Sequence, residues 1–248
     1  MNSDFNLTKK NQTVSIFPIS DVHVGTPLFN QEYYEYMLHK FDTTSGYKII
    51  YLLGDLMDCA TKRLGQSAYE QVLSPEEQLD YIVKSLKPYK KHIRACVIGN
   101  HEARFRKEFD LDIMSILCDQ LGISYAAEIY DTLLINDKPY VVWGNHGTKT
   151  SQQLHLMQGQ VQRQTSHIEA NLYLYGHAHY LNSWSLVHKD GDTYKRRHYV
   201  LTGHYLNYEG SYAQEKMLKP SLPGFSKISV DSNYRTMVDL YNYDEIML

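Results

Sequence analysis

The segment KIIYLLGD, residues 48–55, is an apolar run that stops at a glycine followed by an aspartate. A short apolar run rich in Ile and Leu and bounded by glycine predicts a buried strand. In α/β sheets, sites form beyond the carboxyl ends of the strands, where loops from distant parts of the chain converge. Asp55 is therefore a candidate functional residue as well as a marker of the strand end.

The same arrangement follows four other apolar segments. Strands are predicted at residues 14–20, 93–98, 141–143 and 172–175. The five strands lead into turns with metal-capable or acid–base side chains: Asp21-Val22-His23, Gly54-Asp55-Leu56-Met57-Asp58, Gly99-Asn100-His101-Glu102, Asn145-His146-Gly147 and Gly176-His177-Ala178-His179. Because strand ends far apart in the sequence can meet at one edge of a sheet, we expect these turns to form one site.

Helical segments alternate with these strands. The clearest begins at Ser74, where Pro75 suits the first turn and Glu77 completes a capping box, and it ends before Pro88. Three further helices are predicted, one at residues 31–41, an amphipathic one that Gly122 closes, and a Gln-rich one at residues 151–164. Strands that alternate with helices predict an α/β fold.

The C-terminal third has a different pattern. Strands at residues 183–188 and 194–202 flank the turn Asp190-Gly191, which is a strong hairpin signal. Final strands are predicted at residues 227–230 and 236–241. Neither repeats nor a low-complexity linker divides the chain, so we expect a single domain over residues 1–248.

Composition excludes several classes of protein. The chain has 248 residues and a net charge of −3, which argues against a nucleic-acid coat or a membrane-surface protein. No apolar run approaches the ~20 residues that span a bilayer, and the polar N-terminus has no signal-peptide pattern. Three cysteines without paired spacing (Cys59, Cys96 and Cys118) predict reduced thiols. We therefore expect a cytoplasmic protein without a membrane partner.

Each motif has an ordinary structural interpretation when it is taken alone. Asp-x-His occurs by chance in many chains, Gly-Asp is a common solvated turn, and two histidines in Gly-His-Ala-His can lie on the surface. The combination, in which every motif follows an apolar strand, is much harder to explain in that way. Carboxylate, imidazole and amide donors together suit Mn, Fe or Zn, and the absence of cysteine argues against a structural zinc site.

The ordered set Asp-x-His, Gly-Asp-x-x-Asp, Gly-Asn-His-Glu, His-Gly and Gly-His-x-His resembles the calcineurin-like metallophosphoesterase superfamily. The resemblance implies two packed, mixed β-sheets flanked by helices, a four-layer αββα sandwich. It also implies two divalent ions, with Mn expected first and Fe, Zn, Ni or Co as alternatives. The segment at residues 202–224 is similar to one in compact members of the family that bacteriophages and prophages encode.

The resemblance also implies roles for individual residues. Asp21, His23 and His179 would hold one ion, Asn100, His146 and His177 would hold the other, and Asp55 would bridge the two. His101 corresponds to the catalytic histidine that protonates the leaving group. Asp58 corresponds to the carboxylate that orients this histidine.

The substrate is less clearly indicated. The protein-phosphatase branch of the family has an arginine where this chain has Cys59. Nearby cations can form a rim that recruits an anionic substrate, or they can be solvated charges. These cations are Lys62, Arg63, Arg104, Arg106 and Lys107. Four tyrosines, Tyr180, Tyr205, Tyr208 and Tyr212, can stack on bases or cover the sheet surface.

Three hypotheses for the function follow. The first is a dinuclear-metal phosphodiesterase that acts on nucleotides, cyclic nucleotides or short nucleic acid. The alternative is a phosphomonoesterase that acts on proteins or small metabolites. The third is a binding module without turnover, which the complete motif set disfavours. No additional domain of the kind that clamps duplex DNA in the repair nucleases of the family is visible in the sequence.

Overall fold

The computed structural model describes residues 6–7, 12–61, 70–148 and 151–243. Its strands are β1 (Asn6–Leu7), β2 (Thr13–Ile19), β3 (Tyr47–Leu52), β4 (Ile93–Val97), β5 (Tyr125–Ala126), β6 (Ile129–Ile135), β7 (Lys138–Asn145), β8 (Leu172–Tyr175), β9 (Leu181–Asp190), β10 (Thr193–His204), β11 (Gly224–Asp231) and β12 (Thr236–Asn242). Its helices are α1 (Gln31–Thr43), α3 (Pro75–Leu86), the 3-10 turn η2 (Lys87–Tyr89), α4 (Asn100–Phe109), α5 (Ile113–Leu121), α6 (Leu154–Gln164) and α7 (Tyr212–Glu215).

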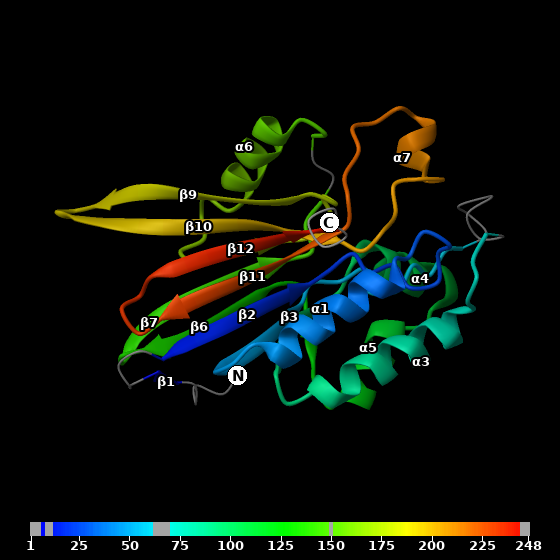
Figure 1. Ribbon diagram of the computed structural model, residues 1–248, viewed down its shortest axis with the longest axis horizontal. Coiled ribbons are helices and arrows are strands. Elements are labelled where there is room, and N and C mark those ends of the chain that lie inside the picture. Colours follow the sequence, from blue (N-terminus) through cyan, green and yellow to red (C-terminus); the bar gives the residue numbers. More distant parts are fainter. Residues whose placement is uncertain (1–5, 8–11, 62–69, 149–150, 244–248) are drawn as a thin grey trace.

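The strands form two mixed sheets that are joined at one point. One half runs β1-β6-β7-β8-β10, with β9 paired to β10, and the other runs β11-β2-β3-β4-β5, with β12 paired to β11. Only the pairs Gly203–Phe225 and His204–Gly224 connect β10 to β11. The β9–β10 hairpin projects from the body of the molecule (Figure 1).

The alternation of side chains along the strands builds a core on each face of the sheets. Along β3, Ile49 and Tyr51 point into a cluster shared with strands β6, β7, β8 and β10, whereas Ile50 and Leu52 pack with α1, α3 and α5. On the outer face of the other half, Tyr173 and Tyr199 pack with α6. The order helices, sheet, sheet, helix confirms the predicted αββα sandwich.

Local signals in the sequence set several boundaries correctly. The Ser74 side chain accepts from the backbone N–H of Glu77, and Glu77 bonds back to Ser74, as the capping box predicts. Gly122 ends α5 in the left-handed conformation with φ of 69°. The helix predicted from residue 151 begins only at Leu154, and the predictions missed β6 and the extent of α4. No helix of the described residues is long and apolar enough to cross a membrane.

Candidate metal centre and active site

The turns after strands β2, β3 and β8 hold their polar side chains in an unusual backbone conformation. Five of the predicted site residues have positive φ angles between 49° and 61°: Asp21, His23, Asp55, His177 and His179. Such angles cost about 1–3 kcal/mol for a residue other than glycine and persist where the surroundings enforce them. The strain is therefore concentrated at the strand ends where the sequence predicts the site.

Two glycines allow the turns after β3 and β4 to touch. A Cβ on Gly54 would lie 2.3 Å from the backbone nitrogen of Gly99, and a Cβ on Gly99 would lie 2.2 Å from Oδ1 of Asp55. Side chains at these positions are therefore excluded. The close approach lets the N–H of His101, in the first turn of α4, donate to Oδ1 of Asp55 at 2.8 Å.

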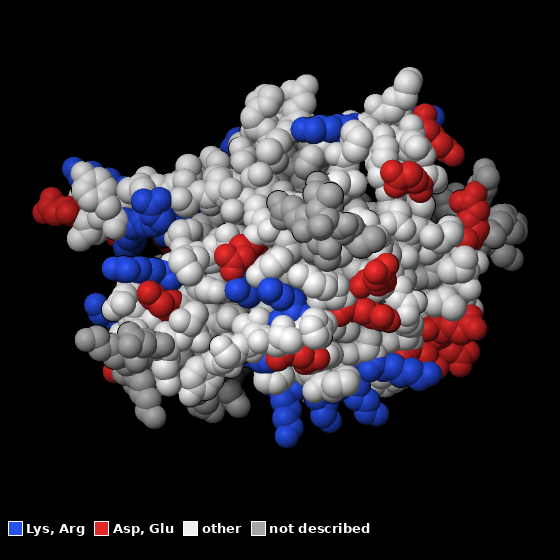
Figure 2. Space-filling view, in the orientation of Figure 1, with Lys and Arg blue, Asp and Glu red and all other residues white. Residues whose placement is uncertain are grey.

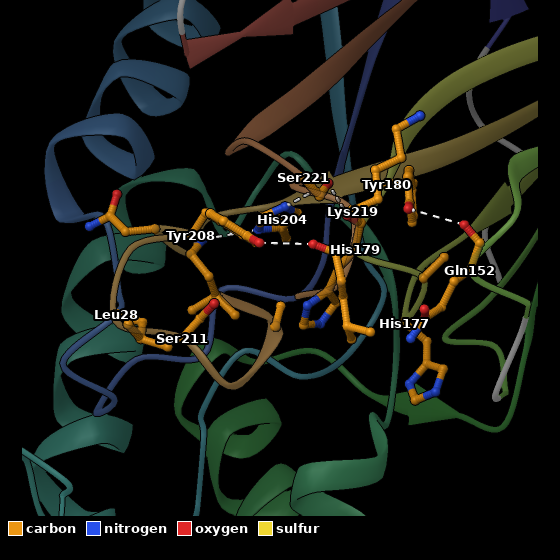
Figure 3. A pocket seen from close by; sticks show the side chains of 15 residues that line it. Leu28, Gln152, His177, His179, Tyr180, His204, Tyr208, Ser211, Lys219 and Ser221 are labelled. Carbon is orange, nitrogen blue, oxygen red and sulfur yellow. Dashed lines mark hydrogen bonds between the residues drawn. The ribbon is translucent and has the colours of Figure 1, made fainter. Parts of the chain in front are cut away.

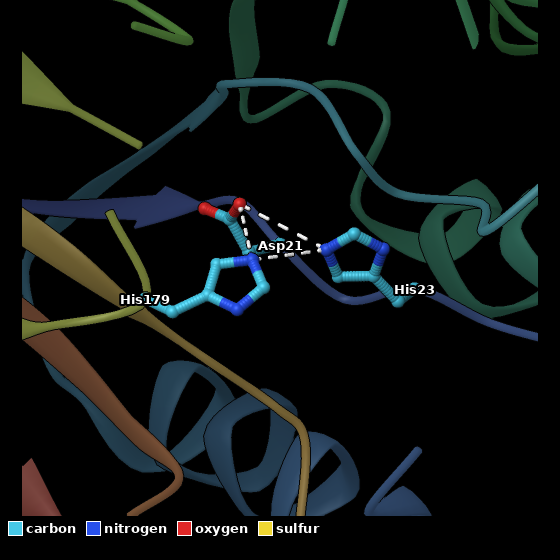
Figure 4. Close-up of side chains that lie close together, drawn as sticks. All are labelled: Asp21, His23 and His179. Atoms are coloured by element: carbon cyan, nitrogen blue, oxygen red, sulfur yellow. Dashed lines mark hydrogen bonds and ion pairs between the residues drawn. The ribbon is translucent and has the colours of Figure 1, made fainter. Parts of the chain in front are cut away.

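The first cluster consists of Asp21, His23 and His179, which point toward one another (Figure 4). Nε2 of His179 lies 3.2 Å from Oδ1 of Asp21 and 3.2 Å from Nε2 of His23. Nδ1 of His23 lies 3.2 Å from Oδ1 of Asp58, so its proton is used there and Nε2 is left with a lone pair. Two imidazole nitrogens and a carboxylate oxygen thus face a common point.

The second cluster brings together Asp55, Asn100, His146 and His177. Nδ1 of His146 lies 2.7 Å from the carbonyl of Leu53, which directs Nε2 toward Oδ2 of Asp55 at 3.1 Å. One terminal atom of the Asn100 amide lies 2.6 Å from Nδ1 of His177, 2.9 Å from Nε2 of His146 and 3.3 Å from Oδ2 of Asp55. When that atom is the oxygen, four acceptors face a common point, which is the arrangement a cation requires.

The electrostatics of the two clusters also fit positive charge at their centres. Burial opposes ionisation of Asp21, but the hydrogen bond and charge of His179 lower its pKa to about 2. Burial likewise opposes ionisation of Asp55, while its contact with His146 keeps its pKa far below the usual range. Burial lowers the pKa of His146, but Asp55 outweighs it and raises that pKa to about 9. Bound metal ions would supply the positive charge in place of such protons.

Asp55 lies between the two clusters. Its Oδ2 atom is 3.1 Å from Nε2 of His146 in the second cluster and 3.8 Å from Nε2 of His23 in the first. The carboxylate is 1% exposed and is therefore held in place by its surroundings. This position is the one that the family resemblance assigns to a bridging ligand.

His101 lies beside the clusters and is held by Asp58. Its Nδ1 atom is 2.6 Å from the backbone carbonyl of Asp58 and 3.3 Å from the carboxylate of the same residue. Nε2 is left facing the site, 3.8 Å from Oδ2 of Asp55. Burial lowers the pKa of His101, but Asp58 and Asp55 outweigh it and raise that pKa to about 9. Asp58 therefore contacts both His101 and His23, one more histidine than we predicted.

Sequence reasoning assigned no role to Glu102, although it quoted the motif that contains it. The side chain is fully buried, and its two oxygens accept from four backbone N–H groups at 2.8–3.1 Å: those of Asp55, Leu56, Met57 and Gly99. Glu102 thus ties the turn after β3 to the start of α4. Its position three residues after Gly99, at the start of a helix, is a capping signal that could have revealed this role.

His204 and Ser221 were also missed. The ring of His204 stacks on that of His179 with 5.2 Å between centroids, and its Nε2 atom lies 3.1 Å from Oγ of Ser221. The Ser221 hydroxyl donates in turn to the backbone carbonyl of His179. The pair Gly203-His204 repeats the glycine–polar pattern at the end of β10, so the same search applied to that strand would have found it.

The predicted cationic rim is only partly described. Lys62 and Arg63 lie outside the described residues. Arg106 forms an ion pair with Asp112 at 3.1 Å, which gives it a structural contact at the start of α5. Arg104 differs, because its Nε and Nη2 atoms are buried without a hydrogen-bond partner among the residues that the structure describes. Lys107 is exposed.

The four tyrosines after the metal motifs have different environments. Tyr205 is 1% exposed and packs against Tyr33 and Tyr34 in the core, so it is neither a stacking platform nor part of the sheet surface. Tyr180 and Tyr208 line a pocket beside His177 and His179. The side chain of Tyr212 lies outside the described part of the chain.

Comparison with known proteins adds information about the family. The family model for calcineurin-like phosphoesterases matches residues 15–223. A comparison with curated proteins returns no match. A hypothetical protein from Thermus thermophilus aligns with a TM-score of 0.48 and 10% identity over 94% of this chain and 99% of that chain. A protein of unknown function from Aquifex aeolicus aligns with a TM-score of 0.36 and 14% identity over 94% and 98% of the two chains.

Proposed function

Because the chain belongs to the calcineurin-like phosphoesterase family, which comprises metal-dependent hydrolases, we propose that it is a phosphodiesterase acting on nucleotide-type esters. One observation carries the proposal. Five strand ends bring seven candidate ligand side chains and His101 together: Asp21, His23, Asp55, Asn100, His146, His177 and His179. A shared fold alone would not require all of these side chains to face one another.

In this proposal Asp21, His23 and His179 would hold one divalent ion, and Asn100, His146 and His177 would hold the other. Asp55 lies between the two groups and would serve both. Two such ions, when bound, neutralise phosphate oxygens and make a water acidic enough to attack at neutral pH. The carboxylate, imidazole and amide donors suit Mn, Fe or Zn, and we propose Mn first.

The proposed roles of His101 and Asp58 follow from their contacts. His101 directs Nε2 toward the site, where it can donate a proton to the departing alkoxide, a contribution of roughly 10²–10⁴-fold. The Asp58 carbonyl and carboxylate accept from Nδ1–H, which fixes the ring and the tautomer. Asp58 is thus a positioning residue, and His101 is the group that moves a proton.

The charge distribution favours a small ester over a long nucleic acid. The face in Figure 2 carries Lys, Arg, Asp and Glu side chains in separate small groups, with no continuous basic field on it. The net charge of the chain is −3. A protein that follows a polymer backbone neutralises many phosphates with a basic surface. We therefore place nucleotides and cyclic nucleotides before nucleic acid as substrates.

Phosphomonoesterase activity remains the second candidate, and Arg104 is the reason. Its Nε and Nη2 atoms are buried without a hydrogen-bond partner among the described residues, so the guanidinium is available to an anionic ligand. Cys59 occupies the position at which the protein-phosphatase branch of the family has a phosphate-binding arginine. Arg104 can therefore supply the missing cation from α4.

The buried cysteines support a cytoplasmic location, which we also propose. Cys59, Cys96 and Cys118 are all free and buried. Free thiols persist where the compartment is reducing.

A hydrolysis panel tests the proposed reaction. Bis-p-nitrophenyl phosphate, p-nitrophenyl phosphate, cyclic nucleotides and single-stranded DNA are compared in Mn²⁺, with Zn²⁺, Ni²⁺ and Co²⁺ as alternatives. We expect the diester to be cleaved faster than the monoester and activity to disappear with a chelator. Faster cleavage of the monoester would favour the second candidate. No hydrolysis with any metal would refute both.

A further inference from the structure

A pocket of about 280 Å³ opens beside the two clusters and shares His179 with the first and His177 with the second. The connection between β10 and β11, residues 205–223, forms one wall, and Leu28 and Gln152 come from other parts of the chain (Figure 3). A ligand with its phosphoryl group at these two histidines would therefore direct an attached group into the pocket. Neither the sequence motifs nor the proposed reaction assigns this pocket a role.

The lining of the pocket is mainly apolar, and Lys219 is the one Lys, Arg, Asp or Glu among its described lining residues. Leu28, Leu206, Ala213 and Leu218 supply its apolar surface, and the described lining residues include no carboxylate. Lys219 is exposed, and its side chain extends away from the two histidines in Figure 3. A lining of this kind favours an uncharged group over a second phosphate or a carboxylate.

Two tyrosines are fixed at the pocket by their hydroxyl groups. Tyr208 donates to the carbonyl of Leu218 at 2.8 Å, and Tyr180 donates to the carbonyl of Gln152 at 3.2 Å. Because the hydroxyls are engaged, the rings remain as flat apolar surfaces on either side of His179 (Figure 3). Fixed aromatic rings bind flat ligands with little loss of side-chain entropy.

The wall is also attached to the metal centre. The N–H of Tyr205 donates to the carbonyl of Asp21 at 3.2 Å, and the N–H of Asn207 donates to the carbonyl of Leu28 at 2.8 Å. Ser221 bonds to the carbonyl of His179 from the other end of the connection. The pocket is therefore positioned relative to the two histidines by the same backbone that carries them.

We propose that this pocket binds the uncharged ring system of a nucleoside phosphate ester while the phosphoryl group lies at His177 and His179. Pockets that enclose a whole drug-sized ligand measure about 300–1,000 Å³, so one of 280 Å³ accepts a single nucleoside rather than successive nucleotides. The inference rests on the proposed function, because it takes the two histidines as the site of the phosphoryl group.

The test uses two diesters with the same leaving group. Methyl p-nitrophenyl phosphate and the p-nitrophenyl ester of thymidine 5′-monophosphate release the same phenolate, and they differ only in methyl against nucleoside. In Mn²⁺ we expect kcat/KM of the intact protein to be about tenfold or more higher for the nucleoside ester. This is the effect expected when one base stacks on an aromatic side chain. Equal values would refute the pocket and leave the phosphoesterase intact.

Variants of the pocket then test whether it causes the preference for the nucleoside ester over the methyl ester. Ala213→Leu fills the pocket and keeps a good helix former in α7, so it should remove the preference for the nucleoside ester through KM. Glu215→Leu adds bulk at an exposed position of the same helix and should keep the preference. Leu218→Ala, which shortens the wall, should weaken it if Ala213→Leu fails to fold. A preference that survives in folded pocket variants would refute the assignment.

A binding measurement separates this proposal from the proposed reaction. If neither ester is hydrolysed, the phosphoesterase proposal fails, but thymidine 5′-monophosphate should still raise Tm more than inorganic phosphate at equal concentration. Ala213→Leu should abolish that difference. Equal shifts for the two ligands would refute the pocket whether or not the protein is active.

Discussion

The strand-end clusters and the β10–β11 connection meet at one pocket, yet they are built differently. In the clusters, Asp21 and Asp55 are at most 1% exposed, and the backbone is strained at most of the candidate ligands. In the connection, Leu206 and Tyr208 are half-buried and Met217 is 91% exposed. The carboxylates of the clusters are buried and strained, whereas the connection has a face available to a ligand.

The difference teaches how reaction and specificity are divided within this fold. Strained, buried residues with several partners can hold a charge-dense metal centre in one geometry. A connection on the surface can change without disturbing that geometry, which is why loops on rigid scaffolds commonly determine specificity. Changes in the clusters should therefore abolish turnover, whereas changes in the connection should alter substrate preference.

The largest effect is expected for the candidate metal ligands. Asp55→Asn should lower turnover to background and reduce metal content, because it removes the negative charge that both clusters face. The variant keeps an oxygen for the N–H of His101, so it should remain folded. Metal content by mass spectrometry, circular dichroism and hydrolysis in Mn²⁺ measure the three quantities.

His177→Ala should give the same loss of metal and turnover. Asp119→Asn and His39→Ala, which change the same residue types at exposed helical positions, serve as matched controls and should retain both. A wild-type rate at saturating substrate in either cluster variant would contradict the metal assignment.

The clusters were predictable because the seven candidate ligands follow the ends of five apolar strands. The approximate positions of Asp55 and His177 follow from local patterns and from the rule that sites form at strand ends. The αββα fold, by contrast, was expected from the family resemblance. Local patterns predict only that strands and helices alternate.

Other features were not predictable, because they depend on packing between distant segments. Tyr205 follows a strand as the candidate ligands do, but it packs against Tyr33 of α1 and so belongs to the core. The four N–H groups that Glu102 binds come from two segments. The pocket is formed by Leu28, Gln152, residues 177–180 and the β10–β11 connection, and of these segments only 177–180 follows one of the metal motifs.

The second-largest effect is expected at His101. His101→Ala should keep the metal and lower kcat by roughly 10²–10⁴-fold for esters with poor leaving groups. The loss should shrink for p-nitrophenolate, which departs without a proton. A series of diesters with leaving groups of increasing pKa measures the dependence. An equal loss across the series would argue against proton donation.

A smaller effect, mainly on stability, is expected at Glu102. Glu102→Gln replaces one of two accepting oxygens with an amide group that cannot accept, so two backbone N–H groups lose a partner. We expect the free energy of unfolding to fall by about 1–3 kcal/mol and metal affinity to weaken. Urea denaturation and metal titration measure these effects. Glu32→Gln, at an exposed position of α1, is the control. Unchanged stability would show that the four hydrogen bonds are dispensable.

The smallest effects are expected at the two arginines of α4, and they should differ from each other. Arg104→Gln should raise KM about tenfold and leave kcat nearly unchanged. A tenfold rise is what the loss of one charged hydrogen bond to an anionic substrate would produce. Arg106→Gln removes a half-exposed ion pair with Asp112, so it should lower stability only slightly and leave KM unchanged.

Salt dependence sharpens this last prediction. A substrate with one or two charges releases few counterions, so kcat/KM should fall only weakly as salt rises, whereas an oligonucleotide would respond steeply. We expect the weak response, because the chain has a net charge of −3 and the face in Figure 2 carries charges of both signs. A steep fall of kcat/KM with salt for single-stranded DNA would contradict this expectation. If Arg104→Gln abolished that fall and Arg106→Gln left it intact, α4 would be part of a nucleic-acid-binding surface. In that case the pocket beside His179 would hold only the terminal nucleoside of a longer chain.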